Sequence, residues 1–379
     1  MKEHKKEIML VVGEASGDVH GAQLHRAIRK RDSQVKIYGV GGEELQRTDF
    51  EALFSVSQLT GMGLVELAGN IKQLWQAYRL LRLTLRQRRP NLLVLIDFPE
   101  FNLHLAKLAK SLHIPVLYYI SPQIWAWRRG RVRQIARWVD QMAVVFPFEV
   151  PFYKRYGVKV TFVGHPLLDT VQVKQNRERV LEKLNLDPRK TTVALLPGSR
   201  PREVGYHLPV MLDAAVSLRE ERDIQFVCVR ASTVGRGEIE AISRKVPLVI
   251  PVIEDDRYDV VSAVDLVWTA SGTATLETAL LLKPMLIVYR LSWLTYWLAR
   301  LLVRVEHIGM VNLVAGERVV PELVQSDFKA KKIIQESRIL LDNQQIRAKI
   351  ISKLTNLRGQ LGSRGAAERV ADIAFAMLA

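Results

Sequence analysis

Acidic side chains follow two of the apolar segments in the first half of the chain. Glu14, Ser16 and Asp18 come after the apolar run 8–12, and Asp97 comes directly after the run 92–96. In an open parallel sheet, ligands bind at the carboxyl ends of the strands. A carboxylate at such a place can act as a general base once its pKa is raised, and we predict this role for Asp97. The alternative is that Asp97 only caps its own loop.

The loop 13–18 reads GEASGD, which is neither the dinucleotide-binding fingerprint nor a P-loop. Its glycines allow a ligand to approach the backbone, but its two carboxylates would repel a phosphate. We therefore expect Glu14, Ser16 and Asp18 to orient the hydroxyl groups of a sugar. A plain strand-to-helix turn, with Asp18 as the helix N-cap, is the alternative interpretation.

The second half of the chain carries residues of the type that bind phosphate. A glycine and an arginine follow the apolar run 192–196, where they can offer an amide and a fixed cation. Small residues follow the run 266–268 and leave the amides of the next helix open to an anion. Glu277 lies too far into that helix for a capping box, so we expect it to hold ribose hydroxyls. The predicted phosphate-binding residues are Gly198, Ser199, Arg200, Ser271, Gly272 and Thr273.

Two segments have the pattern of helices that lie on an anionic membrane. The segment 70–89 has an apolar stripe bordered by basic residues at every seventh position, and 291–304 places aromatic residues beside arginines. A core helix with a solvated basic edge is the alternative for the first segment. The predicted membrane or acyl-chain contacts are Leu64, Leu67, Leu74, Trp75, Tyr78, Leu81, Trp293 and Trp297.

These residues require a scaffold, and the alternation of short apolar runs with helical segments predicts an α/β fold with parallel sheets. The rhythm occurs twice, which suggests two domains, 1–170 and 190–349. The charge-rich stretch 169–190 is the best candidate for the joint.

Composition narrows the class of protein. The chain has 379 residues, with 55 Lys and Arg against 39 Asp and Glu, a formal net charge of +16. Such an excess of basic residues points to nucleic acid, an anionic membrane or phosphorylated substrates. Cys228 is the single cysteine, which excludes an internal disulfide, and no zinc-ligand pattern occurs, so we expect no metal and no cofactor. The run 8–12 is too short for a signal peptide, and 111–127, the longest uncharged stretch, contains two prolines; we predict no membrane span.

Taken together, five motifs resemble the lipid A disaccharide synthases. They are GEASGD at 13–18, SPQIWAWR at 121–128, LPGSR at 196–200, SGTATLE at 271–277 and VPELVQ at 320–325. The resemblance runs in order from about residue 8 to the end. Two positions depart from the family pattern: Glu100 stands where Asp is more usual, and Val311 stands where Pro usually precedes Asn312.

The resemblance implies a GT-B fold, with two Rossmann-like domains whose parallel sheets face a central cleft. Helices from about 350 to 379 are expected to pack back onto the first domain, and a homodimer is expected. The implied reaction joins UDP-2,3-diacylglucosamine to 2,3-diacylglucosamine 1-phosphate (lipid X) and gives the β-1,6 disaccharide 1-phosphate of lipid A, a lipopolysaccharide precursor, and UDP. By the same resemblance the enzyme is metal-independent and works at the cytoplasmic face of the inner membrane. Asn312 and Glu322 would join the donor site, and Arg128 would bind the acceptor.

Three alternatives remain open on the sequence. Another GT-B enzyme that uses a UDP-amino sugar, either a transferase of undecaprenyl-linked acceptors or a UDP-sugar epimerase, would share the architecture. A basic RNA-binding protein would explain the net charge and the mixture of tryptophan and arginine in 125–137, but not the carboxylate-bearing loops. We therefore expect no nucleic-acid partner.

Overall fold

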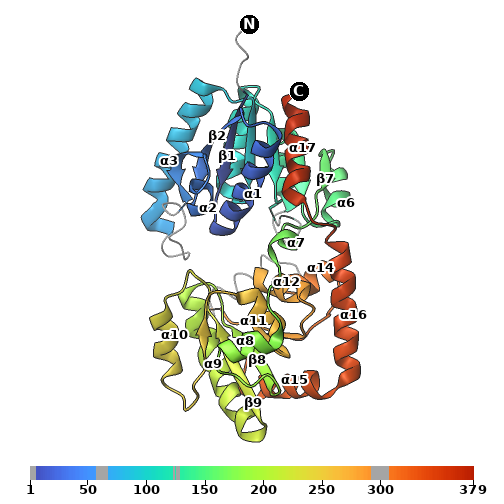
Figure 1. Cartoon of the computed structure of the whole chain (residues 1–379). Helices are drawn as coiled ribbons and strands as arrows, with labels where there is room; N and C mark the ends of the chain where they lie inside the picture. The colour runs from blue at the N-terminus through green and yellow to red at the C-terminus, as the bar shows by residue number, and fades with distance from the viewer. Residues whose placement is uncertain (1–5, 57–66, 123, 125–128, 292–306) are drawn as a thin grey trace. The chain divides into compact units, whose positions relative to one another are not determined.

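A computed structural model describes residues 6–56, 67–122, 124, 129–291 and 307–379. The chain divides into two compact units (Figure 1). One contains residues 1–169 together with 361–379, and the other contains 170–360. Of the predicted residues, Leu64, Arg128, Trp293 and Trp297 lie outside the described part of the chain, as does the side chain of Leu67.

The first unit is built on a parallel sheet of seven strands in the order β3-β2-β1-β4-β5-β6-β7. Its central strands are almost wholly inaccessible to solvent, which is typical of parallel sheets covered on both faces. The strands are β1 (Glu7–Val12), β2 (Lys36–Gly41), β3 (Glu51–Ser55), β4 (Leu92–Ile96), β5 (Val116–Tyr119), β6 (Gln141–Val144) and β7 (Val160–Phe162). The helices are α1 (Ala15–Arg31), α2 (Glu43–Gln46), α3 (Leu67–Arg88), α4 (Pro99–Ser111), α5 (Val132–Trp138), α6 (Glu149–Lys154), α7 (Leu167–Thr170) and the C-terminal α17 (Ala366–Leu378), with a 3-10 turn at Arg129–Arg131.

The second unit has a parallel sheet of six strands in the order β10-β9-β8-β11-β12-β13. The strands are β8 (Thr191–Leu196), β9 (Ile224–Val229), β10 (Val252–Ile253), β11 (Leu266–Ala270), β12 (Met285–Tyr289) and β13 (Glu322–Val324). The helices are α8 (Arg177–Lys183), α9 (Pro201–Glu221), α10 (Arg236–Ser243), α11 (Arg257–Ala263), α12 (Thr273–Leu280), α14 (Met310–Ala315), α15 (Ala330–Asp342) and α16 (Gln344–Gln360), with a 3-10 turn at Gln325–Asp327.

Each sheet has one point at which the strand order reverses. In the first unit this switch point lies between β1 and β4, and in the second it lies between β8 and β11. Connections from two neighbouring strands leave in opposite directions at such a point, so a crevice forms at their carboxyl ends. The loops that begin at Gly13, Asp97, Pro197 and Ser271 all start there, which explains why the sequence places its polar motifs in them.

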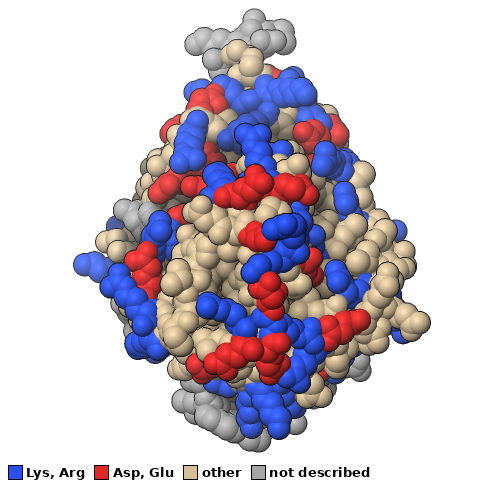
Figure 2. Space-filling model, turned by 60° about the horizontal axis from the view of Figure 1, so that its bottom comes forward, with Lys and Arg blue, Asp and Glu red and all other residues tan. Residues whose placement is uncertain are grey.

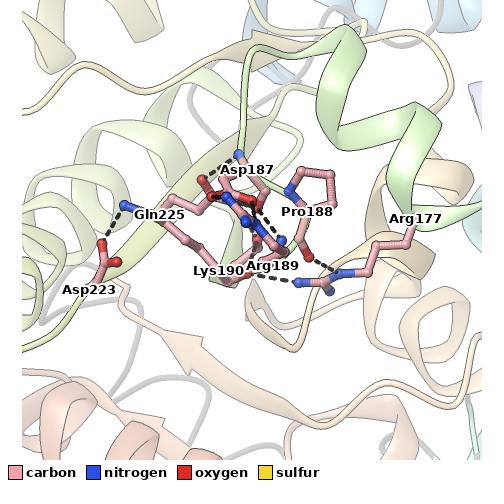
Figure 3. Close-up of polar contacts among 8 residues, drawn as sticks. Arg177, Asp187, Pro188, Arg189, Lys190, Asp223 and Gln225 are labelled. Carbon is pink, nitrogen blue, oxygen red and sulfur yellow. Dashed lines mark hydrogen bonds and ion pairs between the residues drawn. The ribbon is translucent and has the colours of Figure 1, made fainter.

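The segment between the two series is not a free linker. Residues 170–190 belong to the second unit and contain α8. Arg177 fixes them there, because its guanidinium donates to the carbonyl oxygens of Pro188 (3.0 Å) and Lys190 (2.8 Å) (Figure 3). It also donates to Asp265 at 3.0 Å. Gln225 of β9 donates to the carbonyl oxygen of Asp187, in the loop before β8, at 2.7 Å. The second unit therefore begins about twenty residues before the boundary at 190 that the sequence suggested.

The return of the chain to the first unit starts at Leu361, rather than at about 350. Helix α16 stays in the second unit because its buried residues Ile350, Leu354 and Leu357 form the face that packs beside α12 and α14. Helix α17 then packs on α1, where Arg31 donates to Asp372 (2.8 Å) and to the Glu368 carbonyl oxygen (2.8 Å).

In the described part of the chain, no helix is both long enough and apolar enough to cross a membrane.

Candidate active site

Asp97 lies at the carboxyl end of β4 in an unusual backbone conformation. Asp97 and Phe98 are both left-handed, with φ of 52° and 47°. Residues other than glycine rarely adopt this backbone region, and two such residues in succession need support from their surroundings. One support is Gly13 at the end of β1: a Cβ atom there would lie 2.0 Å from the Cβ of Phe98. A glycine at position 13 is thus what admits the Asp97–Phe98 turn.

The surroundings of Asp97 raise its pKa to about 6. Burial is the main cause, because a carboxylate loses solvation there, and the negative charge of Glu14 adds to the effect; a hydrogen bond from the Phe98 amide opposes both. A carboxylate with this pKa is ionised at neutral pH and is still basic enough to take up a proton.

Two residues that the sequence analysis did not select hold the main chain of Asp97. Asn102 donates to the Asp97 carbonyl oxygen at 2.7 Å, and Tyr118 donates to the same oxygen at 2.6 Å. A polar residue within a buried helical stretch was the only signal of Asn102 in the sequence, and nothing distinguished Tyr118 from Tyr119.

Asp18 does not have the position that a sugar ligand requires, so this prediction is wrong. Its side chain is only 4% exposed, and its carboxylate accepts from the backbone amides of Gly42 (2.7 Å), Glu44 (2.8 Å) and Leu45 (3.3 Å). Asp18 therefore fixes the start of α2, because it satisfies amides that the helix leaves unpaired. It does not cap its own helix either. Glu14 and Ser16, by contrast, are exposed at the start of α1.

In the second unit, the loop after β8 already contains an anion of its own. Gly198 has a φ of 133°, and the Ser199 amide donates to Oε2 of Glu203 at 3.1 Å. Arg200 is well exposed, and its guanidinium lies 3.9 Å from the other oxygen of Glu203. The Ser199 amide is thus not open, whereas the Arg200 side chain is available to a ligand.

His207 connects this loop to the end of β12. The imidazole is wholly buried; Nδ1 lies 2.8 Å from the Pro197 carbonyl oxygen, and Nε2 accepts from the Arg290 amide at 3.0 Å. Burial lowers the pKa of His207, so the ring is neutral and donates through Nδ1. The sequence analysis did not select His207.

The loop after β11 keeps the form that an anion site needs. Ser271 donates through its hydroxyl to the Ile308 carbonyl oxygen at 2.8 Å. Gly272 has a φ of 150°, and a Cβ atom there would meet nothing within 4 Å, so space remains in front of the first turn of α12. Thr273 begins that helix and is exposed.

Glu277 lies on the next turn of α12 and has partners of its own. Its Oε1 accepts from Arg257 (2.8 Å) and from the hydroxyl of Tyr258 (2.9 Å). The Arg257 guanidinium also lies 4.7 Å from the centre of the Tyr258 ring. The three side chains hold one another, and the partially buried Glu277 can meet a ligand only with the rest of its carboxylate.

Asn312 is not placed as a ligand, so that prediction is wrong, whereas Glu322 is half-buried and its place in the donor site stays a prediction. Asn312 is wholly buried, and its amide donates to the Val320 carbonyl oxygen and to Glu322 and accepts from the amides of Val319 and Val320. Glu322 accepts from the amides of Ile308 (3.1 Å) and Gly309 (3.0 Å). Together they hold the loop that contains Ile308, whose carbonyl oxygen accepts from the Ser271 hydroxyl. They therefore support the position of Ser271 through this loop.

A cavity of about 300 Å³ opens beside the carboxyl ends of β9 and β10. It is lined by both charge types, including Lys183, Arg230, Arg236 and Asp256. A neighbouring cavity of about 340 Å³ reaches Arg257 and Tyr258, the partners of Glu277. The acidic run 254–256 after an apolar segment was the sequence signal that could have marked it. In the described part of the chain, no group of three or more His, Cys, Asp or Glu side chains could hold a metal ion.

The two parallel sheets and their switch points define a protein of the GT-B class. Solved structures of that architecture match over nearly the whole chain. They include a putative UDP-N-acetylglucosamine 2-epimerase from Listeria monocytogenes (TM-score 0.68, 14% identity, covering 98% of this chain and 96% of that one). The glycotransferase of kitacinnamycin matches with a TM-score of 0.66 at 13% identity, covering 99% of this chain and all of that one. Identity this low establishes the fold alone.

Sequence comparison assigns the family. The model of the lipid-A-disaccharide synthetase family matches residues 8–374. A lipid-A-disaccharide synthase of Geobacter sulfurreducens is 46% identical over 372 residues, covering 98% of this chain and 97% of the relative. That of Nitrosococcus oceani is 43% identical over 372 residues, covering 98% and 96%. This chain belongs to the lipid-A-disaccharide synthetase family.

Proposed function

We propose that this chain is an inverting hexosyltransferase that joins UDP-2,3-diacylglucosamine to 2,3-diacylglucosamine 1-phosphate, with Asp97 as the general base. The products are the β-1,6 disaccharide 1-phosphate and UDP. The observation that carries the proposal is the place of Asp97: a carboxylate of raised pKa at the switch point of the first sheet, in a chain of this family.

The chemistry needs one proton transfer and one displacement. The acceptor 6-hydroxyl oxygen attacks the anomeric carbon of the donor while Asp97 takes its proton. The bond from that carbon to the UDP oxygen breaks, and the electron pair leaves with UDP. A single displacement inverts the anomeric centre, as an α-linked donor and a β-linked product require.

The donor diphosphate is assigned to the second unit. The start of α12 at Gly272 and Thr273 offers amides, whereas the Ser271 amide already donates to the Val288 carbonyl oxygen at 3.1 Å. The exposed Arg200 offers a fixed positive charge. Both would stabilise the negative charge that UDP gains as it departs, since preorganised donors act most strongly where charge develops. The ribose is assigned to Glu277, whose Oε1 is held by Arg257 and Tyr258.

Membrane contact is assigned to the outer side of α3. Trp75 is 60% exposed, Leu83 is 45% exposed, and Arg79 lies 5.7 Å from the Trp75 ring. An exposed tryptophan beside arginine side chains suits an anionic lipid surface. Leu81 is wholly buried, so its predicted acyl-chain contact is wrong. Tyr78 packs edge-on against Phe101 at 6.2 Å and connects α3 to α4.

A peripheral position at the cytoplasmic face of the inner membrane and a homodimer remain parts of this proposal. On the surface in Figure 2, basic side chains lie beside acidic ones rather than in one uninterrupted patch. On this face, the distribution favours a few local contacts with phosphate groups over a continuous track for nucleic acid.

The test is to incubate the protein with both glycolipids and identify the products. We expect UDP and a tetraacylated disaccharide monophosphate by mass, with a β-linkage by NMR. Release of UDP or a change of the donor sugar without disaccharide would contradict the proposal and would favour a UDP-sugar epimerase or a transferase with another acceptor.

A further inference from the structure

We propose that Tyr118 and Asn102 are positioning residues that hold Asp97 in its left-handed conformation and so aim its carboxylate at the acceptor hydroxyl. The inference deepens the proposed function and rests on the role of Asp97 as the base. Neither residue touches the substrates in this account; both act through the main chain of Asp97.

Two side-chain donors converge on one main-chain oxygen of Asp97. The Asp97 carbonyl oxygen accepts from the Tyr118 hydroxyl at 2.6 Å and from Asn102 Nδ2 at 2.7 Å. Asn102 also lies 3.2 Å from the preceding carbonyl oxygen, that of Ile96, and donates to it. A carbonyl with two side-chain donors cannot rotate without losing both bonds, so the peptide between Asp97 and Phe98 is fixed in direction.

The conformation of Asp97 needs this support. Residues 97 and 98 both have positive φ, a region that is unfavourable for residues other than glycine. Such a turn persists only where its surroundings determine it, and it is typical of functional sites. An extended backbone at Asp97 would turn its side chain to another side of the strand end, away from the switch point.

The neighbouring Tyr119 differs from Tyr118 in its contacts. Tyr118 and Tyr119 are consecutive residues of β5, and both are wholly buried. Their side chains point to opposite faces of the sheet. The Tyr118 hydroxyl bonds to Asp97, whereas the Tyr119 hydroxyl has no hydrogen-bond partner among the described residues. The chain thus supplies its own control: two buried hydroxyl groups on one strand, only one of which reaches the base.

The experiment compares Tyr118→Phe with Tyr119→Phe in the full-length protein. Each variant removes one oxygen atom and keeps the ring. We expect Tyr118→Phe to lower kcat by about 10-fold to 100-fold, since small misplacements of a reacting group have effects of this size. The KM for the donor should stay within about twofold, because the donor site is assigned to the other unit. Tyr119→Phe should leave both constants near those of the wild type.

A pH profile separates positioning from a merely structural role. A released Asp97 side chain would gain solvent, so the acid limb of kcat/KM should move to lower pH in Tyr118→Phe and stay in place in Tyr119→Phe. Asn102→Ser, which removes the other donor, should repeat both effects, with thermal unfolding recorded to confirm that it folds. If Tyr118→Phe and Asn102→Ser only lower the melting temperature, while kcat and the acid limb match those of Tyr119→Phe, the inference is wrong.

Asp97→Asn distinguishes this failure from failure of the proposed function. Retained turnover in Asp97→Asn would show that Asp97 is not the base, and both proposals would fall. An inactive Asp97→Asn beside a fully active Tyr118→Phe would leave the base in place and remove only the positioning role.

Discussion

At the scale of single residues, the electrostatics of Asp97 determine how the enzyme should respond to pH. Burial and Glu14 raise the pKa of Asp97 to about 6, and the base works only when ionised. Below this pH we expect kcat/KM to fall about tenfold per pH unit. Glu14→Gln removes the like charge, so the acid limb should move to lower pH.

Glu100→Gln is the matched control for that measurement. It removes a carboxylate from the first turn of α4, three residues after Asp97, but Glu100 is paired with Arg131 at 2.7 Å and does not contribute to the shift at Asp97. The acid limb of kcat/KM in Glu100→Gln should lie at the same pH as in the wild type. An unchanged limb in Glu14→Gln, or the same shift in both variants, would contradict this account of the pKa.

The position of Asp97 could be predicted from sequence because a polar residue directly after a buried parallel strand lies at the carboxyl end of the sheet. The residues that contact Asp97 could not be predicted. Tyr118 is 21 residues away and meets Asp97 only because β4 and β5 are neighbours in the sheet. The prediction for Asn312 was wrong for a different reason. The sequence shows a polar side chain near a motif, but it does not show that backbone amides already donate to that side chain.

At the scale of elements, α3 has an inner face in the core and an outer face that we propose contacts the membrane. Leu81 and Leu85 are wholly buried, whereas Trp75 and Leu83 are exposed. We expect Trp75→Ser with Leu83→Ser to weaken binding to vesicles that contain anionic phospholipid, without a loss of thermal stability. Co-sedimentation of the protein with vesicles measures the effect.

The matched change on the inner face is Leu81→Ser. It should lower the stability of the fold by several kcal/mol, because a polar group replaces a buried leucine. Equal vesicle binding by the wild type and the outer-face variant would show that α3 does not contact the membrane.

Helix α17 gives a second prediction at this scale. The structure buries Val370 and four alanines of α17, with Ala371 and Ala374 wholly inaccessible, whereas Ile373 is only half-buried. Small side chains allow α17 to lie close to α1, and a sequence pattern does not show which helix will be the neighbour.

We therefore expect Ala371→Leu to destabilise the protein by about 1–3 kcal/mol through overpacking. Ile373→Leu, a change of shape at a partly exposed position, should alter stability by less than about 1 kcal/mol. Chemical denaturation followed by circular dichroism compares the two. A well-tolerated leucine at position 371 would contradict the close packing of α17 on α1.

At the scale of the whole molecule, the proposed reaction uses residues from both units of one chain. Asp97 belongs to the first unit, and Arg200 to the second. Since Arg200 is proposed to stabilise departing UDP, Arg200→Ala should lower kcat by about 100-fold, the typical effect of removing one preorganised donor. Excess EDTA should leave the wild-type rate unchanged. The sequence has no Asp-x-Asp motif, which is the usual sign of a metal-bound nucleotide diphosphate in other glycosyltransferases.

One result from each of these two experiments would contradict the proposed donor site. A rate that is lost in EDTA and recovers only with a divalent cation would mean that a metal ion carries the charge of the leaving group. An Arg200→Ala variant with a normal kcat would remove Arg200 from the donor site. Arg202→Ala, two residues further on and also exposed, is the control.

The division into two units was evident in the sequence because each repeats the alternation of strand and helix. The exact limits were not, since they depend on contacts between distant segments. Arg177 ties residues 170–190 to the second sheet through Asp265, 88 residues further on. Likewise, Asp169 accepts from the amide of Gly365 at 2.8 Å, which ties the returning tail to the first unit. Neither pairing has a local signal.

The central claim is that Asp97 removes the proton from the acceptor, and the comparison of wild type with Asp97→Asn tests it most directly. The measurement is the rate of disaccharide formation from the two glycolipids, with the affinity for UDP determined on the same preparations. We predict that Asp97→Asn forms no detectable disaccharide and binds UDP with an affinity close to that of the wild type. Disaccharide formation at a rate near that of the wild type would contradict the account.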